Sequence, residues 1–403
     1  MSKHSAGATP RGSAGTVALA HRFGGVGKRA LETLIDGYTG QHPDSSVQLI
    51  QKDNVKLEVK CDFMREDPPD AWINWPAENL RPYHTAKVLE PLDDVWESTG
   101  LDANCQQAVR EDCRIDGTAY AVPLNVQRTN NVFYNRSVLD SAGVDPAALD
   151  TPEQFVRALE TVEAETDACG IALAQRNPWV TLQLWETVLM GADGVQTFER
   201  VKDGEARSHA RAIGTALDTV ERCRAHSPEG AVYLSSGGAN QQLVEGDAGF
   251  VFGGDWAVGD FQGAEEFEQG EHWGHTTFPG TDDVYARAGD AFLVPRKESS
   301  QARESFLEYI CSGDAMARFC AERGAIPPRL DAPMDRFEPF FTDQQRDFER
   351  CSHSPLTVVG PGVSSAAFID LKMAFVDFLT SGDVEATTDQ LVAAFDDNVE
   401  PVA

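Results

Sequence analysis

The sequence predicts an α/β protein built from two domains, or from two lobes that share chain crossings. Its 403 residues are more than a single hydrophobic core normally organises. A strand-like run, an amphipathic helical pattern and a second strand-like run follow one another within residues 16–50, which is the pattern of a βαβ unit. A βαβ unit implies a parallel sheet with covering helices.

The first elements of this unit are defined by apolar periodicity and by the glycine and proline residues that interrupt it. Residues 16–20 are β-prone, and residues 47–50 restore strand character after Pro43. Between them, apolar side chains recur at helical spacing, namely Ala30, Leu31, Leu34, Ile35 and Tyr38. The GGVGK segment that opens this helix is not a phosphate loop, because Arg22 and Arg29 replace the required glycine and hydroxyl residue. It remains a glycine-rich turn that lets a ligand approach backbone N–H groups.

Three further elements follow from local signals. Asp116 and Gly117 separate Ile115 from the run 118–122, which predicts a hairpin. A helix is expected from Thr151 to near Gly170. Its start is indicated by TPEQ, which supplies an N-cap, a proline at the first helical position and a glutamine at the third. A strand is expected to follow at 171–174. One long helix is expected over residues 301–322, capped by Gly324.

Residues 246–295 are the most informative stretch. Residues 250–252 read as a buried strand that Gly253 and Gly254 close, and Asp255 suits a helix N-cap. Trp256 is then expected just beyond the carboxyl end of a strand, where α/β proteins build ligand crevices. An aromatic face beside carboxylates suits a sugar; the alternative is that Trp256 belongs to the core.

The charge excludes some functions and indicates an environment. Lys and Arg total 34 against 64 Asp and Glu, a net charge of −30, which argues against nucleic acid as a partner. The acids are scattered rather than clustered, and lysine is scarce, so we expect a protein from a high-salt environment. No apolar run is long enough to span a membrane. Residues 1–15 are expected to form a flexible arm, and no signal peptide is visible in them.

Signatures of catalysis or of metal binding are not found. The eight cysteines form no CxxC pair and no zinc-type spacing, and whether they form disulfides stays open. Cys311 and Cys320 are expected to act as small apolar residues. His272 and His275 bracket Trp273 but have no third ligand in view. No cofactor is expected, and no nucleophile or metalloprotease motif occurs.

Aromatic and amide-rich segments supply candidate ligand-binding residues. PPDAWINW (68–75) carries Trp72 and Trp75, and either ring can instead be packed in the core. Mixed donors and acceptors gather in VPLNVQRTN (122–130), namely Asn125, Gln127, Arg128 and Asn130. That segment can equally be a polar crossover between strands. Trp179, at the start of a helical pattern beside Asn177, is a better stacking candidate than Trp185.

These segments, taken in order, resemble the family 1 extracellular solute-binding proteins of ABC transporters, and especially their glucose- and mannose-type members. The resemblance covers nearly the whole chain after about residue 16. It is carried by the following fragments: HPDSSV, DPPDAW, LEPLDDVW, DGTAYAVPLNVQRTNNVFYN, TPEQF, NPWVTLQLWE, GDWAVGDF with FPGT, GDAFLVP and GAIPPRLD.

The resemblance implies a two-lobed, periplasmic-binding-protein-like type II fold, each lobe a mixed sheet flanked by helices, with a hinge between them. Lobe 1 is then expected to comprise residues 16–122 and 283–325, and lobe 2 residues 123–282 and 326–403. It also implies a monomeric, extracellular, surface-associated protein that closes on a sugar and presents it to the transmembrane subunits of an ABC permease.

The resemblance further implies a sugar site, in which Trp179, Asn130 and Gln127 of one lobe act with Trp256 and Asp255, while Asp290 and Arg323 come from other crossings. The chain departs from the family pattern at Arg22 and Phe23, where paired tryptophans are usual, and at Ile73 and Trp75, where a polar pair is usual. Two alternatives remain open: a glycoside-processing enzyme, which also uses aromatic platforms and acids, and a cytoplasmic sugar sensor.

Overall fold

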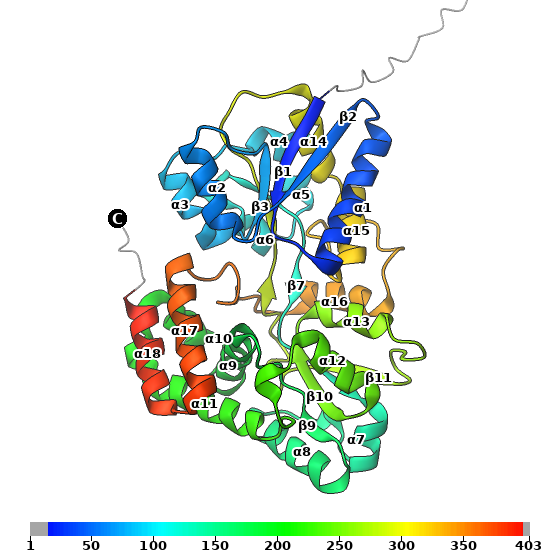
Figure 1. The fold of residues 1–403 in the computed structure, drawn as a ribbon, viewed down its shortest axis with the longest axis vertical. Coiled ribbons are helices and arrows are strands. Elements are labelled where there is room, and N and C mark those ends of the chain that lie inside the picture. The colour runs from blue at the N-terminus through cyan, green and yellow to red at the C-terminus, as the bar shows by residue number, and fades with distance from the viewer. Residues whose placement is uncertain (1–14, 398–403) are drawn as a thin grey trace, which may run out of the picture.

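The structure is a computed structural model that describes residues 15–397 and consists of two lobes, each a sheet flanked by helices (Figure 1). The arm expected at residues 1–15 falls almost wholly outside the described residues. Its last residue, Gly15, belongs to the first strand and pairs with Ser45.

The upper lobe in Figure 1 is built on a five-stranded mixed sheet in the order β2-β1-β3-β13-β6. The strands are β1 (Gly15–His21), β2 (Ser45–Gln51), β3 (Ala71–Asn74), β6 (Ala121–Pro123) and β13 (Ala291–Leu293). The first three run parallel, as the βαβ pattern predicts, and β13 runs antiparallel to β3 and β6. The short hairpin β4 (Arg114–Ile115) and β5 (Thr118–Ala119) lies beside this sheet and confirms the predicted Asp116-Gly117 turn.

Helices cover both faces of this sheet (Figure 1). On one side α1 (Gly25–Gln41) packs on α15 (Gly313–Arg323), and α14 (Gln301–Ile310) packs on β1. The other helices of this lobe are α2 (Val55–Met64), α3 (Arg81–Thr85), α4 (Asp93–Ser98), α5 (Leu101–Asn104) and α6 (Gln107–Asp112).

The lower lobe contains a four-stranded sheet in the order β11-β8-β10-β9. Its strands are β8 (Asn131–Asn135), β9 (Cys169–Ile171), β10 (Ala248–Gly253) and β11 (Trp273–Thr277). The strand predicted at 250–252 is β10, and all its residues but Gly253 are buried. Because β10 pairs antiparallel with β8 and parallel with β9, this sheet is also mixed.

The helices of the lower lobe flank its sheet and include the C-terminal part of the chain (Figure 1). They are α7 (Arg136–Ala142), α8 (Pro152–Glu165), α9 (Pro178–Asp193), α10 (Val195–Arg200), α11 (Ala210–Ala225), α12 (Ser236–Glu245), α13 (Val258–Gln262), α16 (Pro339–Arg350), α17 (Ser365–Ser381) and α18 (Val384–Asp396). Helix α17 packs on α9 and α18, and α18 also packs on α11.

The chain passes between the lobes three times, and the three crossings are hydrogen-bonded together. The first crossing contains β7 (Gln127–Arg128), and the second contains β12 (Arg287–Ala288), which pairs antiparallel with β7. In the third, Ile326 bridges Val126. The predicted boundaries after residues 122, 282 and 325 lie in or beside these crossings, and we propose the same division of the chain.

Two predicted helices differ from the observed ones. The single helix expected over 301–322 is wrong: the chain breaks at Cys311 and Ser312, because the Ser312 hydroxyl accepts a hydrogen bond from the Ala315 N–H and caps a new helix, α15. Gly324 ends α15 at a φ of 73°, as predicted. Helix α8 starts with the predicted Thr151 cap but ends at Glu165 rather than near Gly170.

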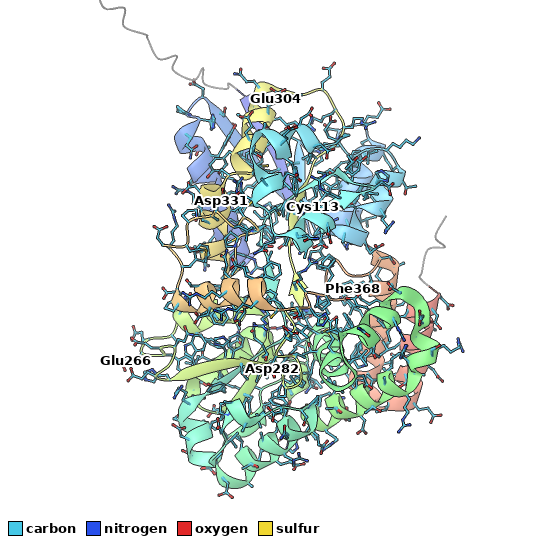
Figure 2. The ribbon with its side chains drawn as sticks, turned by 180° about the vertical axis from the view of Figure 1, so that it is seen from behind. Cys113, Glu266, Asp282, Glu304, Asp331 and Phe368 are labelled. Carbon is cyan, nitrogen blue, oxygen red and sulfur yellow. The ribbon has the colours of Figure 1, made fainter. Side chains whose placement is uncertain are left out.

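The outer surface carries scattered acids, as the composition indicates. Glu266, Glu304 and Asp331 lie on the outside of the two lobes (Figure 2), and all three are exposed. All eight cysteines lie within the described residues and are unpaired, with Cys311 and Cys320 fully buried. No helix of residues 15–397 has the length and apolar character needed to cross a membrane.

Candidate functional site

A cleft of about 630 Å³ lies between the lobes, and residues from both line it. This volume is within the range of sites for small organic ligands. The lining residues come from the turn between β1 and α1, the ends of β3 and α15, the crossings, the starts of α9 and α13, and α17. The cleft therefore occupies the edge of both sheets where strands end, which is where α/β folds place ligands.

The upper wall is centred on Asp290, which the second crossing places at the start of β13. The Asp290 side chain is only 4% exposed, and its Oδ1 accepts a hydrogen bond of 2.8 Å from the Arg22 guanidinium. Asn125 fixes the Asp290 segment, because its Oδ1 accepts from the Asp290 N–H at 2.7 Å. Arg22 and Asp290 thus form a polar pair at the surface of the cleft.

Trp75 follows β3 and lines the same wall, but cations cover its ring. The guanidinium carbon of Arg22 lies 4.7 Å from the ring centroid of Trp75, and the Lys56 Nζ lies 4.5 Å from it. Phe368 of α17 approaches edge-on at 5.6 Å from the opposite lobe. Trp75 is therefore a support for two cations and a contact between the lobes.

The lower wall carries two tryptophans in edge-to-face contact. The ring centroids of Trp179, at the start of α9, and Trp256, just after β10, lie 5.9 Å apart at an angle of 62°. Both rings are partly exposed to the cleft. The Trp256 indole occupies the space that a Cβ atom on Gly254 would need, so the glycine lets the ring fold against the backbone.

Gln127 and Arg323 line the cleft beside the crossings. Gln127 donates from Nε2 to the Gly324 carbonyl at 3.0 Å, and its Oε1 accepts from Arg323 at 3.5 Å. Arg323 Nε is buried and has no hydrogen-bond partner among the described residues. Burial lowers the pKa of Arg323, and the nearby Arg22 charge acts in the same direction, while Asp290 opposes both.

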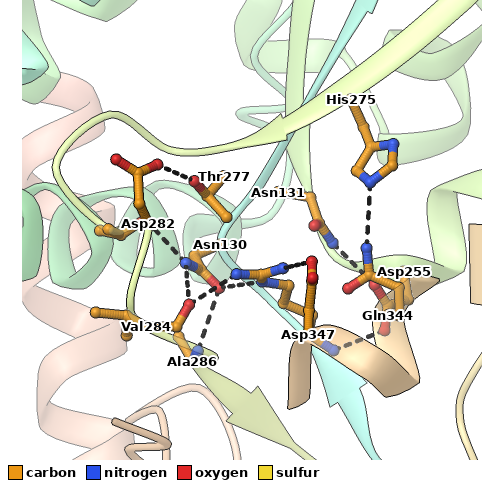
Figure 3. A network of polar contacts seen from close by, with 12 residues as sticks. Asn130, Asn131, Asp255, His275, Thr277, Asp282, Val284, Ala286, Gln344 and Asp347 are labelled. Atoms are coloured by element: carbon orange, nitrogen blue, oxygen red, sulfur yellow. Dashed lines mark hydrogen bonds and ion pairs between the residues drawn. The ribbon is translucent and has the colours of Figure 1, made fainter. Parts of the chain in front are cut away.

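Four of the residues expected at the site do not line the cleft: Asn125, Arg128, Asn130 and Asp255. Each is at most 1% exposed, and protein groups engage its polar atoms. Arg128 binds Asp347 and the Val284 carbonyl. Asn130 donates to the Thr281 hydroxyl and to the Val284 carbonyl, and the latter contact is seen in Figure 3. These side chains hold the crossings and the β10 turn in position.

Asp255 also differs from its expected role as a helix N-cap. Its side chain makes no cap hydrogen bond; instead it accepts from the Arg128 N–H at 2.7 Å and from Asn131 Nδ2 at 2.8 Å. It thereby ties the end of β10 to the first crossing (Figure 3). Burial raises the pKa of Asp255 to about 7, although both hydrogen bonds favour the charged form.

Several lining residues were not identified from the sequence as candidates. Phe23 and Arg22 were noted only as departures from the family pattern, and Asp260, Phe368 and Lys372 carried no signal. Asp260 is exposed at the rim and accepts from Asn240 at 2.7 Å. Phe368 and Lys372 lie on one face of α17, and only the packing of that helix brings them to the cleft.

Polar contacts also join the lobes beside Trp75. Lys56 Nζ donates to Asn79 Oδ1 at 2.5 Å and to Ser365 Oγ at 3.1 Å. Asn79 donates in turn to the Gly360 carbonyl at 3.4 Å. Since Lys56 and Asn79 belong to the upper lobe and Ser365 begins α17, this cluster holds the lobes together at one edge of the cleft.

Comparison with known proteins gives the family. The family of bacterial extracellular solute-binding proteins matches the chain over residues 33–344, which is more than half of its length. The chain belongs to this family. The resemblance inferred from the sequence is thus confirmed at family level, whereas the glucose- and mannose-type subgroup is not.

Curated relatives of this solute-binding protein include two from archaea. The xylose/arabinose-binding protein of Haloferax volcanii is 29% identical over 380 residues, which cover 92% of this chain and 82% of the relative. An uncharacterized ABC transporter extracellular-binding protein of Pyrococcus horikoshii is 26% identical over 354 residues, which cover 86% of this chain and 78% of the relative.

Solved structures share the fold. A chitin oligosaccharide binding protein superimposes with a TM-score of 0.81 at 16% identity, covering 96% of this chain and 99% of that one. A bacterial solute receptor with a preference for β-D-galactopyranose gives a TM-score of 0.79 at 16% identity, covering 95% of this chain and 97% of the receptor. The two-lobed α/β fold expected from the sequence is therefore confirmed.

Proposed function

We propose that this chain is the substrate-binding component of an ABC transporter, which captures a monosaccharide or short oligosaccharide by closure of its lobes and delivers it to a membrane permease. The observation that carries this proposal is the cleft itself, which the Trp179 and Trp256 rings line from one lobe and the ion pair of Arg22 and Asp290 lines from the other side. Sugars present apolar C–H faces and a rim of hydroxyls, so an aromatic wall opposite polar groups complements them.

In this proposal the expected site residues divide into two groups. Those that line the cleft with free faces or polar groups contact the sugar, namely Gln127, Trp179, Trp256, Asp290 and Arg323. Trp75 lines the same cleft, and its ring supports Arg22 and Lys56 there. Those that are buried beneath the cleft, which are Asn125, Arg128, Asn130 and Asp255, position the crossings on which the first group is carried. The three hydrogen-bonded crossings act as the hinge.

The alternative of a glycoside-processing enzyme has less support. Hydrolysis of a glycosidic bond needs two carboxyl groups, one of them a proton donor. Asp290 is ion-paired with Arg22, which makes it a hydrogen-bond acceptor. The second carboxylate that residues 15–397 bring to the cleft, Asp260, lies at the exposed rim. The proposal also includes three properties that we infer from membership of the family: location outside the cell, a monomeric state and a permease partner.

Calorimetric titration at high KCl concentration, against monosaccharides, disaccharides, amino acids and divalent metals, tests the proposal. We expect heat of binding with sugars only, together with a change in tryptophan fluorescence. Chromatography after long incubation should recover the sugar unchanged, and recovery of a cleaved product would favour the enzyme. Binding of amino acids or metals without binding of any sugar would refute the assignment.

A further inference from the structure

The charges around the cleft are opposite in balance to those of the chain as a whole. Carboxylates outnumber Lys and Arg by 64 to 34 in the sequence. Among residues 15–397, three cations line the cleft, namely Arg22, Arg323 and Lys372, and Lys56 lies against the Trp75 ring in its wall. Within the same residues, only Asp260 and Asp290 bring carboxylates to the cleft. In so acidic a protein, this excess of positive charge calls for a specific reason.

Most of this positive charge lacks a carboxylate partner in the described part of the chain. The Asp290 carboxylate is already ion-paired with Arg22. Lys56 binds the neutral Asn79 and Ser365 and lies over the Trp75 ring, and Lys372 approaches the Phe368 ring. Arg323 contacts the neutral Gln127, and the Asp290 carboxylate that acts on its charge is already paired with Arg22. Bringing cations together in a half-buried site without counter-charges is unfavourable unless an anion joins them.

The titration behaviour of these groups agrees with an unmet positive charge. Burial lowers the pKa of Lys56 to about 8, and Arg22 and Lys60 contribute in the same direction, with no carboxylate acting against them. Burial and the charge of Arg22 also lower the pKa of Arg323, and the Asp290 carboxylate offsets them only in part. A bound anion would offset both.

Resting on the proposed sugar-binding function, we propose that the cleft is specific for an anionic sugar, one that carries a carboxylate or phosphate group. The sugar ring packs against Trp179 and Trp256, and its anionic group is held by Arg22 and Lys372 with Lys56 and Arg323 beside them. Arg22 uses one nitrogen for Asp290 and can offer the remainder of its planar fork to an oxyanion. In concentrated salt the net charge of −30 is screened beyond a few ångströms, so it does not repel such a ligand.

Titration of the wild-type chain with matched sugars tests this proposal. D-glucuronate and D-glucose 6-phosphate are compared with D-glucose, D-galacturonate with D-galactose, and acetate and inorganic phosphate serve as anions without a ring. We expect one of the charged sugars to bind at least about tenfold more tightly than its neutral parent, the size of one charge-assisted contact. The carboxylate and phosphate arms identify which anion is recognised.

Two lysine variants locate the effect. Lys372→Gln should weaken binding of the charged sugar about tenfold more than it weakens binding of the neutral parent. Lys87→Gln, at an exposed lysine that does not line the cleft, should leave both unchanged. Equal or tighter binding of the neutral parents would overturn the anionic-sugar proposal while leaving the sugar-binding function intact. Binding of acetate or phosphate but of no sugar would refute both.

Discussion

Gly254 sets the position of the Trp256 indole, and replacing this glycine tests whether the indole binds the ligand. The backbone of Gly254 is extended, with φ −92° and ψ 178°, so alanine can adopt it without strain. The three atoms that an alanine Cβ would approach most closely all belong to the six-membered part of the Trp256 ring. Gly254→Ala must therefore turn the indole away from Gly254 and disturb its edge-to-face contact with Trp179.

The expected loss of affinity follows from the value of one aromatic contact. Such contacts contribute about 0.5–1.5 kcal/mol beyond their buried area. That range corresponds to a roughly two- to twelvefold rise in Kd. The fold should tolerate the change, because alanine adopts the Gly254 backbone without strain and the restricted unfolded chain contributes about 0.4–1 kcal/mol, which offsets part of the cost of displacing the indole.

The neighbouring glycine supplies a matched control. A Cβ atom on Gly253 would meet nothing within 4 Å, so Gly253→Ala adds the same methyl group without touching the indole. Calorimetric Kd values and thermal midpoints are measured for both variants in about 2 M KCl, where charge repulsion is screened. The reasoning is refuted if Gly254→Ala binds the sugar as tightly as Gly253→Ala does, or if both variants lose affinity equally.

Three further predictions concern polarity, pH and salt. Asp290→Ala removes a nearly buried hydrogen-bond acceptor and the partner of Arg22, so the free energy of sugar binding measured by calorimetry should weaken by roughly 2 kcal/mol or more. The thermal midpoint should change little. Normal sugar binding with a much lower midpoint would instead make Asp290 a structural residue. Glu186 is fully buried in α9, and burial raises its pKa from 4.5 to about 8. Between these two pH values the folded state keeps a proton that the unfolded state releases. The free energy of unfolding should therefore fall as pH rises from 4.5 to about 8. Denaturant titrations should show this fall, by up to about 1.4 kcal/mol per pH unit, relative to Glu186→Gln, and a constant difference between the two proteins would contradict it. The thermal midpoint should keep rising in KCl beyond about 1 M, where screening is nearly complete; a plateau there would indicate simple repulsion, and a flat response throughout would remove the inference of a high-salt origin.

Local chemistry in the sequence was sufficient for the elements whose signals lie within a few residues. The Thr151 cap is predicted from a side chain that bonds its own backbone, and the Asp116-Gly117 turn and the Gly324 cap from glycines that adopt a positive φ without a steric cost. Strand β10 and the place of Trp256 after it follow in the same way. The break at Ser312 had an equally local signal, a serine before glycine and aspartate, but the apolar periodicity on either side of it favoured one continuous helix.

The sequence alone determined the α/β class, the acidic character and the segments from which a ligand site would be built, because composition, periodicity and capping depend on neighbours along the chain. Only the tertiary structure decided which side chains of those segments face the cleft. Gln127 reaches the cleft whereas Arg128 and Asn130 are buried, since pairing of the crossings fixes which side each residue faces. Likewise, no local signal could bring Lys372 and Arg22 to one cleft, because this depends on how α17 of the lower lobe meets the upper lobe at Trp75 and Lys56.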